Sequence, residues 1–243
     1  MHRLRSRLKA VERRLSRLSY TRQQGLVDPD KLAQLSVTIA GLGSIGSFTA
    51  LTLTKMGIHR FTFIDKDLVQ LHNVSNQFFT VKHLGKPKVE VALEECRRHS
   101  PEPKKLDVLL KDEEYKDQQL DTDIVIAAFD NIEGRAALFK QSQLSQLVQL
   151  FIDTRMGGEN FSVFSLNPHD SNAAAKYLQD FIDGVSNDVL PCTARSIAYN
   201  VLMVSSLVAS HVKKFATGEP LPFNFSFGFQ HLVQSKTLKA SRT

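Results

Sequence analysis

The sequence predicts an α/β fold in which a doubly wound, mostly parallel, Rossmann-like sheet is flanked by helices. Short runs of apolar and β-branched residues alternate with segments whose apolar residues recur at helical spacing. The first run leads directly into a glycine-rich loop, and an acidic residue ends the next run. The expected strands are 36–40, 60–64, 124–128, 150–153 and 160–166, and the expected helices are 45–56, 86–99, 133–146 and 193–215.

Composition is that of an ordinary globular protein. Of the 243 residues, 42% are hydrophobic and 23% are charged, which suffices for one large domain or two small ones. No apolar stretch approaches the roughly 18 residues of a membrane span, and the first residues lack the apolar region of a secretory signal. We therefore expect a cytoplasmic protein with no membrane span.

Positive charge is concentrated at the N-terminus. The net charge is +6, but residues 1–22 hold eight lysines and arginines and one acid, so the rest of the chain is nearly neutral. We expect a basic amphipathic helix over 1–19 that packs on the body or on a second protomer, or that binds an acidic partner, lipid or nucleic acid. Nucleic acid is not favoured, because nucleic-acid-binding proteins more often spread basic charge over the folded surface. The apolar residues of the expected helix are Leu4, Leu8, Val11, Leu15 and Leu18.

The rest of the chain is expected to form one domain over 20–234. Within it, residues 168–191 are polar and irregular, which predicts a crossover loop with a short helix at 173–182. Residues 235–243 are expected to form a flexible basic tail.

The glycine-rich loop predicts a nucleotide site. Gly41 permits a tight turn, Gly43 lets the backbone approach a phosphate, and Gly46 lets the helix pack close to the strand. The N-terminus of the following helix offers free N–H groups to an anion, and Asp65 is placed to bind ribose hydroxyls. The alternative is a tight strand–helix turn that binds no ligand.

Polar side chains favour ATP with magnesium over a nicotinamide dinucleotide alone. Asp65, Asp67 and Asn73 follow the second expected strand, Lys88 begins the next helix, and Asp130 follows the third strand. Because strand ends gather at one edge of a doubly wound sheet, these groups are expected to converge. Carboxylates, a lysine and a phosphate loop together suit a nucleoside triphosphate and its Mg²⁺.

Five motifs, in order, resemble those of the ThiF/MoeB/HesA family, whose adenylation domain is shared with the ubiquitin-activating (E1-like) enzymes. The resemblance covers residues 20 to about 215. The matching stretches are 20–23 for R-Y-x-R-Q, 41–46 for G-x-G-x-x-G, 65–77 for D-x-D-x-V-x-x-S-N-L-x-R-Q, 85–88 for G-x-x-K, and Asp130-Asn131 for D-N.

By position, the resemblance implies a role for each matched residue. Asp65 holds the ribose, Asn73 and Lys88 contact phosphates, and Asp130 binds Mg²⁺. Arg22 reaches the phosphates, often from a neighbouring subunit, so Arg22, Lys88 and Asp130 are the implied catalytic residues. The remaining nucleotide-binding residues are Gly41, Gly43, Gly46, Asp67, Gln77 and Asn131, and Arg155 lies near the strand that guides the carrier tail.

The activity that the resemblance implies is ATP-dependent adenylation of the C-terminal carboxylate of a ubiquitin-like or sulfur-carrier protein that ends in glycine. Adenylation brings two anions together, so cations must offset their charge. ATP and Mg²⁺ are the implied cofactors. A homodimer and a downstream conjugating enzyme are the implied protein partners.

The two cysteines differ in what they predict. Neither Cys96 nor Cys192 belongs to a Cys-x-x-Cys pair, so the zinc site common in the family is absent from the sequence and no zinc is expected. Pro191-Cys192-Thr193 resembles the thioester motif of ubiquitin-activating enzymes, and a thiol at a helix N-terminus has a lowered pKa. Cys192 is therefore either a thioester nucleophile or a structural residue, and Cys96 is interpreted as structural.

One further departure leaves alternatives open. The family usually has arginine before the glutamine of its R-Q pair, whereas this chain has Asn76 before Gln77. Arg22, Arg135 or Lys86 compensates for the missing charge, or activity is reduced. The alternatives are adenylation of a peptide, small-molecule or tRNA-bound carboxylate, a catalytically reduced carrier-binding subunit, and a nicotinamide oxidoreductase.

Overall fold

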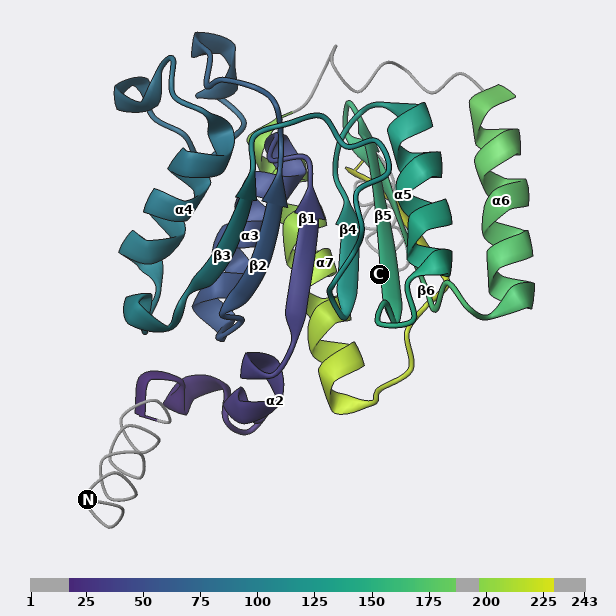
Figure 1. The fold of residues 1–243 in the computed structure, drawn as a ribbon, viewed down its shortest axis with the longest axis horizontal. Helices are drawn as coiled ribbons and strands as arrows, with labels where there is room; N and C mark the ends of the chain where they lie inside the picture. The colour runs from purple at the N-terminus through teal and green to yellow at the C-terminus, as the bar shows by residue number, and fades with distance from the viewer. Residues whose placement is uncertain (1–17, 187–196, 230–243) are drawn as a thin grey trace, which may run out of the picture.

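The computed structural model describes residues 18–186 and 197–229, which form a central sheet covered by helices on both faces (Figure 1). The described sheet has seven strands in the order β3-β2-β1-β4-β5-β6-β7. Their bounds are β1 Ser36–Ala40, β2 Arg60–Ile64, β3 Asp107–Lys111, β4 Ile124–Ala127, β5 Leu150–Gly157, β6 Asn160–Leu166 and β7 Asn224–Gly228.

Pairing within the sheet confirms the predicted fold class. The strands from β3 to β5 pair in parallel, whereas β6 and β7 are added antiparallel. The chain proceeds outward from β1 to β2 and β3, then returns to β4 on the other side of β1. The strand order therefore reverses between β1 and β4, which is where ligands bind in open α/β sheets.

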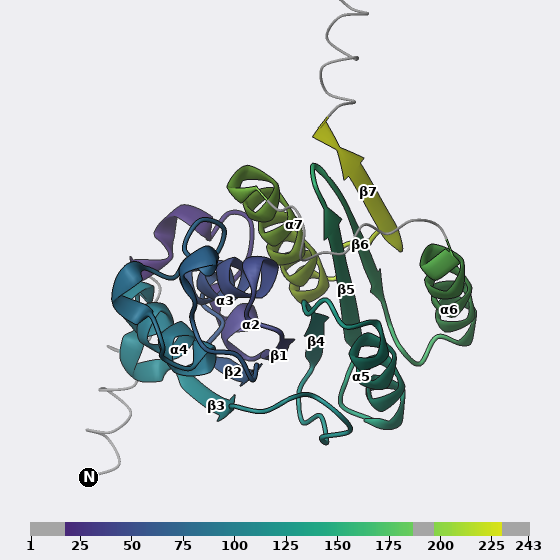
Figure 2. The same ribbon diagram turned by 90° about the horizontal axis from the view of Figure 1, so that it is seen from above.

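Helices α3, α4 and α7 lie on one face of the sheet, and α5 and α6 lie on the other (Figure 2). The apolar residues of β1 alternate accordingly: Val37 and Ile39 belong to the core cluster with α3 and α7, and Ala40 belongs to the cluster with α5. The helices are α2 Pro29–Ala33, α3 Ser44–Met56, α4 Lys88–His99, α5 Ile132–Leu144, α6 Ser171–Ser186 and α7 Ala198–Thr217. The 3-10 turns are η1 Thr21–Gln23, η2 Leu71–Asn73, η3 Val81–His83 and η4 Pro103–Lys105.

The structure differs from the sequence prediction in two strands and two helices, because β3, β7 and the short helix α2 were not predicted and α6 is longer than expected. Strands β3 and β7 are the two edge strands of the described sheet and are partly exposed, so they lack the continuous apolar run that identifies a buried strand. Helix α6 occupies most of the expected crossover loop and is much longer than the helix expected at 173–182. Its Ala174 and Tyr177 pack on the sheet while most of its other described side chains face solvent, which gave the segment a loop-like composition.

Several predicted features lie outside the described residues: Cys192, the tail 235–243 and all but the end of the helix expected over 1–19. Cys96 is fully buried in α4, and burial raises the pKa of its thiol to about 12, which fits a structural role. Among the described residues, none of the helices has both the length and the apolar character needed to cross a bilayer.

Candidate nucleotide site

Two glycines of the loop between β1 and α3 are required by the packing of the chain itself. Gly41 has a φ of +92°, and a Cβ there would lie 2.7 Å from the backbone nitrogen of Phe129. A Cβ on Gly46 would lie 1.8 Å from the carbonyl oxygen of Gly41, so only glycine lets α3 start this close to the strand. These residues set the geometry of the turn.

Gly43 is different, because the space beside it is open. A Cβ there would meet only the Gln77 side-chain nitrogen, at 4.0 Å. Gly43 also occupies the N-cap position of α3, and no side chain caps this helix. The first N–H groups of α3, beginning at Ser44, therefore face the open space without a side-chain acceptor, which is the arrangement that binds anions.

Asp65 fastens the glycine loop to the end of β2. One carboxylate oxygen accepts a hydrogen bond from the Leu42 N–H (2.6 Å) and the other accepts one from the Asp67 N–H (2.8 Å). Burial raises the pKa of Asp65, against the opposing effects of Lys88 and of these backbone donors. The carboxylate is thus held rigidly at the rim of the loop, in the position predicted for a ribose ligand.

The polar run after β2 folds back over the loop. Lys88 is 5% exposed and its Nζ lies 2.8 Å from Oδ2 of Asp67. The Asn73 side-chain oxygen accepts a hydrogen bond from the Gln70 N–H, which leaves its amide NH₂ as the end available to a ligand. Gln77 contributes a buried side-chain oxygen that has no hydrogen-bond partner within the described ranges.

These elements enclose a cavity of about 290 Å³ at the carboxyl ends of β1 and β4. Its volume is at the lower end of the range for small-molecule sites. Eight of the predicted site residues line it, together: Gly41, Gly43, Asp65, Asp67, Asn73, Gln77, Lys88 and Asp130. The predicted convergence of polar groups at one edge of the sheet is therefore present.

The other predicted residues lie elsewhere. Gly46 is buried behind the loop, and Asn131 caps α5 by accepting a hydrogen bond from the Gly134 N–H at 3.1 Å. Arg22 is exposed on η1, which is held to the far end of α3 because Gln23 donates a hydrogen bond to the Met56 carbonyl at 2.6 Å. Since α3 has 13 residues and rises about 1.5 Å per residue, Arg22 is roughly 20 Å from the cavity of its own chain.

The cavity lining also includes His72, Thr154 and Arg135, and of these only Arg135 had been predicted near the site, as a cation that could compensate for Asn76. Arg135 is 5% exposed and forms an ion pair with the fully buried Asp153 on β5. The available signal was its position five residues after Asp130, because Asp130 immediately precedes the N-cap of α5 and Arg135 lies near the start of that helix. The Asp153 partner comes from a strand 18 residues further on, and no sequence pattern indicates it.

Arg155 also pairs with Asp153, through its Nε at 2.8 Å, and lies over the Phe164 ring at 4.7 Å. The same aspartate accepts a hydrogen bond from Tyr177 of α6 at 3.0 Å. Burial, followed by the charge of Asp153, raises the pKa of Tyr177, so its hydroxyl stays protonated and donates. One buried carboxylate thus joins α5, β5 and α6 beside the cavity.

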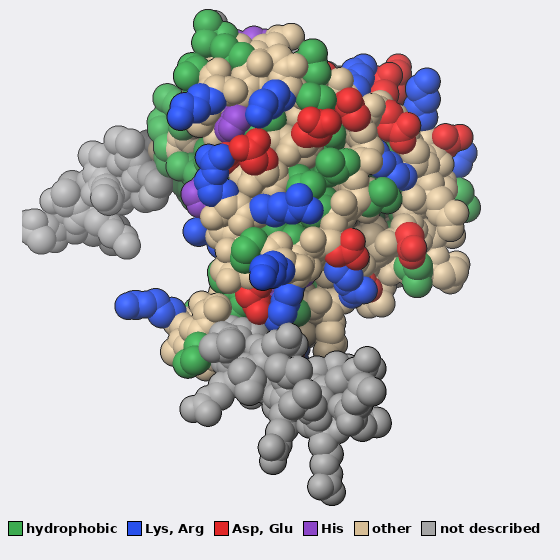
Figure 3. Space-filling view, turned by 60° about the vertical axis from the view of Figure 1, so that its left-hand side comes forward, with side chains coloured by type: hydrophobic (Ala, Val, Ile, Leu, Met, Phe, Trp, Pro, Cys, Tyr) green, Lys and Arg blue, Asp and Glu red, His purple; other side chains and the backbone are tan. Residues whose placement is uncertain are grey.

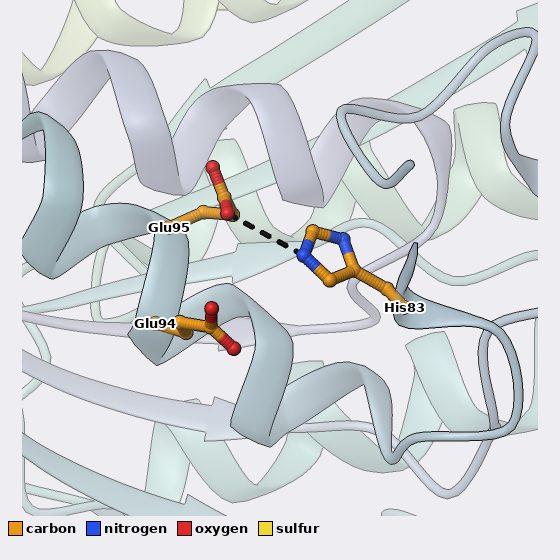
Figure 4. A group of neighbouring side chains, drawn as sticks. All are labelled: His83, Glu94 and Glu95. Atoms are coloured by element: carbon orange, nitrogen blue, oxygen red, sulfur yellow. Dashed lines mark ion pairs between the residues drawn. The ribbon is translucent and has the colours of Figure 1, made fainter. Parts of the chain in front are cut away.

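Three side chains away from the cavity are close enough to suggest a metal site: His83, Glu94 and Glu95 (Figure 4). The His83 Nδ1 accepts a hydrogen bond from the Thr80 N–H at 3.1 Å, which leaves Nε2 as the ring nitrogen available to other groups. That nitrogen faces Glu95 at 3.5 Å, and Arg98 pairs with the same carboxylate at 2.9 Å. The group therefore acts as a structural polar cluster that joins η3 to α4.

Comparison with known proteins supports the family resemblance that the sequence motifs indicate. The chain matches the ThiF family over residues 15–241. It is 29% identical over 159 residues to ubiquitin-like modifier-activating enzyme 5 of Gallus gallus and 32% identical over 138 residues to that of Aedes aegypti. These matches cover 57% and 51% of this chain but only 38% and 35% of the relatives, so the chain matches well under half of their length.

Solved structures share the fold at low sequence identity. E. coli MccB with ATP has a TM-score of 0.67 at 20% identity and covers 83% of this chain and 63% of that one. PaaA has a TM-score of 0.70 at 19% identity, over 88% of this chain and 80% of that one. The ordered motifs, the sheet topology and the match over most of the chain lead to one assignment: this protein belongs to the ThiF family.

Proposed function

We propose that this protein uses ATP to adenylate the C-terminal carboxylate of a ubiquitin-like or sulfur-carrier protein. The observation that carries the proposal is the cavity, where an open Gly43 and an uncapped helix N-terminus lie beside Lys88, Asp67 and Asp130. The relatives named as ubiquitin-like modifier-activating enzymes and the fold shared with an ATP complex of MccB support this substrate class.

The residues present fit a nucleoside triphosphate. The free N–H groups of α3 and the NH₂ group of Asn73 are donors for phosphate oxygens. The carboxylate of Asp65 is placed for ribose hydroxyls, and the exposed carboxylate of Asp130 is a hard oxygen ligand of the kind that Mg²⁺ prefers. Bound Mg²⁺ would offset phosphate charge.

The proposed reaction is a displacement at phosphorus. A carboxylate oxygen of the carrier attacks the α-phosphorus of ATP, the bond from that phosphorus to the bridging oxygen breaks, and pyrophosphate leaves with the electron pair. The products are the carrier acyl-adenylate and pyrophosphate. The chain contributes by positioning both anions and by offsetting their repulsion with Lys88 and the helix N-terminus.

Charge balance supports a dimer as the active form. Three carboxylates line the cavity, at Asp65, Asp67 and Asp130, but its two fixed cations already face carboxylates: Lys88 faces Asp67 and Arg135 faces Asp153. ATP with one Mg²⁺ would still add net negative charge, which a further cation would offset. We propose that Arg22 of a second copy supplies it, because the distance along α3 excludes Arg22 of the same chain.

ATP–pyrophosphate exchange in the presence of candidate carrier proteins tests the proposal. We expect exchange that depends on the carrier and falls roughly 100-fold or more in Asp130→Asn. Glu133→Gln, an exposed acid in the first turn of the same helix, is the matched control and should exchange normally. Exchange that is unchanged in Asp130→Asn would remove the proposed metal ligand.

Peptide substrates are the second candidate, because MccB structures with MccA share the fold. Exchange stimulated by a short peptide carboxylate but by no β-grasp carrier would favour that class. Asn76, which replaces the arginine usual in the family, lines the cavity. If calorimetry detected no ATP binding, this replacement would favour a carrier-binding subunit instead of an enzyme. Binding of NAD(H) in place of ATP would favour an oxidoreductase.

The thioester step at Cys192 stays a prediction from sequence, and nucleic-acid binding by the N-terminal segment stays an alternative that the sequence does not favour. A thiol-labile carrier conjugate that is lost in Cys192→Ser would support the first. On the side of the body that carries α4, basic and acidic side chains are interspersed and form no large basic patch (Figure 3). RNA binding that survives deletion of residues 1–19 would exclude the N-terminal segment as its cause.

A further inference from the structure

Half of one face of the sheet has no helix over it. On the face that carries α5 and α6, those helices contact β4, β5 and β6 (Figure 2). The crossover from β3 to β4, residues 112–123, contains no helix in the described chain, although parallel crossovers usually contain one. Tyr115 and Leu120 of this crossover cover only the carboxyl-terminal half of the face, beside Ala40 and Ile64.

The amino-terminal half of that face is a groove of about 460 Å³, which we call the amino-edge groove. Two large apolar side chains line it and are exposed, Leu109 at 57% and Leu147 at 53%. Three aspartates and one cation also line it: Asp107, Asp121, Asp123 and Arg60, whose guanidinium donates a hydrogen bond to the Gln34 carbonyl. Asp107 and Asp121 are exposed and have no ion-pair partner in residues 18–186 and 197–229, so the lining carries a net negative charge. The groove therefore offers apolar contacts beside unpaired negative charge.

We propose that the amino-edge groove is the docking site for residues 1–17 of the same chain. This segment contains Leu4, Leu8, Val11 and Leu15 among seven lysines and arginines and one acid. Its apolar and basic side chains match the exposed leucines and aspartates of the groove. This complementarity distinguishes it from the rest of the chain, whose charge is close to neutral.

The start of the described chain lies at the same end of the sheet as this groove. The Tyr20 hydroxyl lies 3.4 Å from Nε2 of His59, and a Cβ built on Gly57 would lie 3.2 Å from the Tyr20 ring. The His59 carbonyl in turn accepts a hydrogen bond at 2.8 Å from the N–H of Asp107, a residue of the groove. Two contacts thus connect Tyr20, three residues after the segment and packed against the end of α3 on the other face of the sheet, to Asp107 at the edge of the groove.

The segment is long enough to fill the groove. The face of β3, β2 and β1 up to β4 is about 15 Å wide, at roughly 4.8 Å between neighbouring strands. Seventeen residues span about 25 Å as a helix and more than 50 Å when extended. Residues 1–17 can therefore extend from Tyr20 across the groove without any movement of the rest of the chain.

Photo-crosslinking in the full chain tests this proposal. Leu109→p-benzoylphenylalanine places a crosslinker in the groove, and we expect mass spectrometry to find it joined to residues 1–17. Leu178→p-benzoylphenylalanine, at an exposed leucine of α6, is the control and should not capture that segment. Irradiating an equal mixture of ¹⁵N-labelled and unlabelled protein separates links within one chain from links between two copies.

Charge variants provide the second arm. Asp107→Asn combined with Asp121→Asn should lower the crosslink yield about three- to tenfold, since each exposed ion pair contributes modestly. Asp112→Asn, an exposed acid just past the opposite end of β3, should leave the yield unchanged. Links between isotopically mixed copies, links to another segment, or a yield insensitive to the two aspartates would each overturn the proposal.

Discussion

The two ends of α3 differ in how they are capped. At its C-terminus, Gly57 takes a φ of +109° and donates hydrogen bonds to the carbonyls of Leu53 and Thr54, and Tyr20 covers the turn. At its N-terminus, no side chain caps the helix and the space beside Gly43 is open. One end is completed by the protein, and the other is left for a ligand.

This difference separates the glycines that the fold needs from the one that binding needs. Gly41, Gly46 and Gly57 each sit where a side chain would strike neighbouring atoms or where φ is positive. Gly43 meets neither condition, so the fold alone does not explain it. A glycine that its own chain does not require points to close approach by another molecule.

The largest expected effect is loss of folding in Gly46→Ala. The new Cβ would lie 1.8 Å from the Gly41 carbonyl oxygen, and this contact is with backbone that cannot rotate away. We expect a loss of about 3 kcal/mol or more in unfolding free energy, measured by urea denaturation.

Gly43→Ala is the matched variant in the same loop. It should retain its unfolding free energy and lose nucleotide affinity by about tenfold or more, because the methyl group enters the ligand space. Equal loss of stability in the two alanine variants would contradict the distinction between them.

The next effect is a pH dependence of stability that we expect from His211 on α7, the helix that packs along α3. His211 is buried, its Nδ1 lies 2.7 Å from the Ser165 hydroxyl, and burial, followed by the charge of Lys214, lowers its pKa to about 4. The unfolded chain binds this proton near pH 6.5, so between pH 6.5 and 4 it binds more protons than the native state. Stability should therefore fall by about 3 kcal/mol as pH drops through that window.

His211→Asn keeps a polar partner for Ser165 and cannot titrate. Urea unfolding at pH 7, 5.5 and 4 should show a smaller pH-dependent loss in this variant than in the natural protein. Parallel pH profiles for the two proteins would show that another group is responsible.

A smaller effect is expected at Lys88, on the open side of α3. Lys88→Met removes the charge that faces Asp67 but leaves that carboxylate in contact with solvent, so the fold should persist. Nucleotide affinity should fall roughly 10- to 100-fold, the range for a charge-assisted hydrogen bond. Lys82→Met, which removes an exposed lysine of η3 that does not line the cavity, is the control for isothermal titration with ATP and Mg²⁺. Equal losses in both variants would indicate a general charge effect.

Local patterns predicted the open end of α3 well. The run 36–40, the three glycines and Asp65 are neighbours in sequence, and a parallel sheet brings its carboxyl ends together, so the convergence of Asp65, Asn73, Lys88 and Asp130 followed from topology. The closed end was not predicted, because it depends on Tyr20 meeting Gly57 and His59 across almost 40 residues.

The same limit explains the other differences. Strand β3 carries charged residues at both ends and exposes one face, so its short apolar centre does not stand out from a loop. Arg135 was identified as a cation close to the site, but its burial and its pairing with Asp153 depend on the packing of α5 against β5. Pairs formed between distant elements leave no local signature.

The smallest effect is expected at the closed end of α3. Gly57→Ala forces an alanine to adopt a φ of +109° and places its Cβ 3.2 Å from the Tyr20 ring, so we expect a loss of about 1–2 kcal/mol in unfolding free energy. The nucleotide cavity lies at the other end of the helix, and ATP affinity should therefore stay within about twofold of the natural value. Urea denaturation and isothermal titration on the same preparation measure the two quantities.

The control for backbone strain alone is Gly218→Ala, because Gly218 also has a positive φ but open space around it, and this variant should lose less unfolding free energy. A large loss of ATP affinity in Gly57→Ala would mean that the two ends of α3 are coupled, and the separation between a structural end and a binding end would then fail.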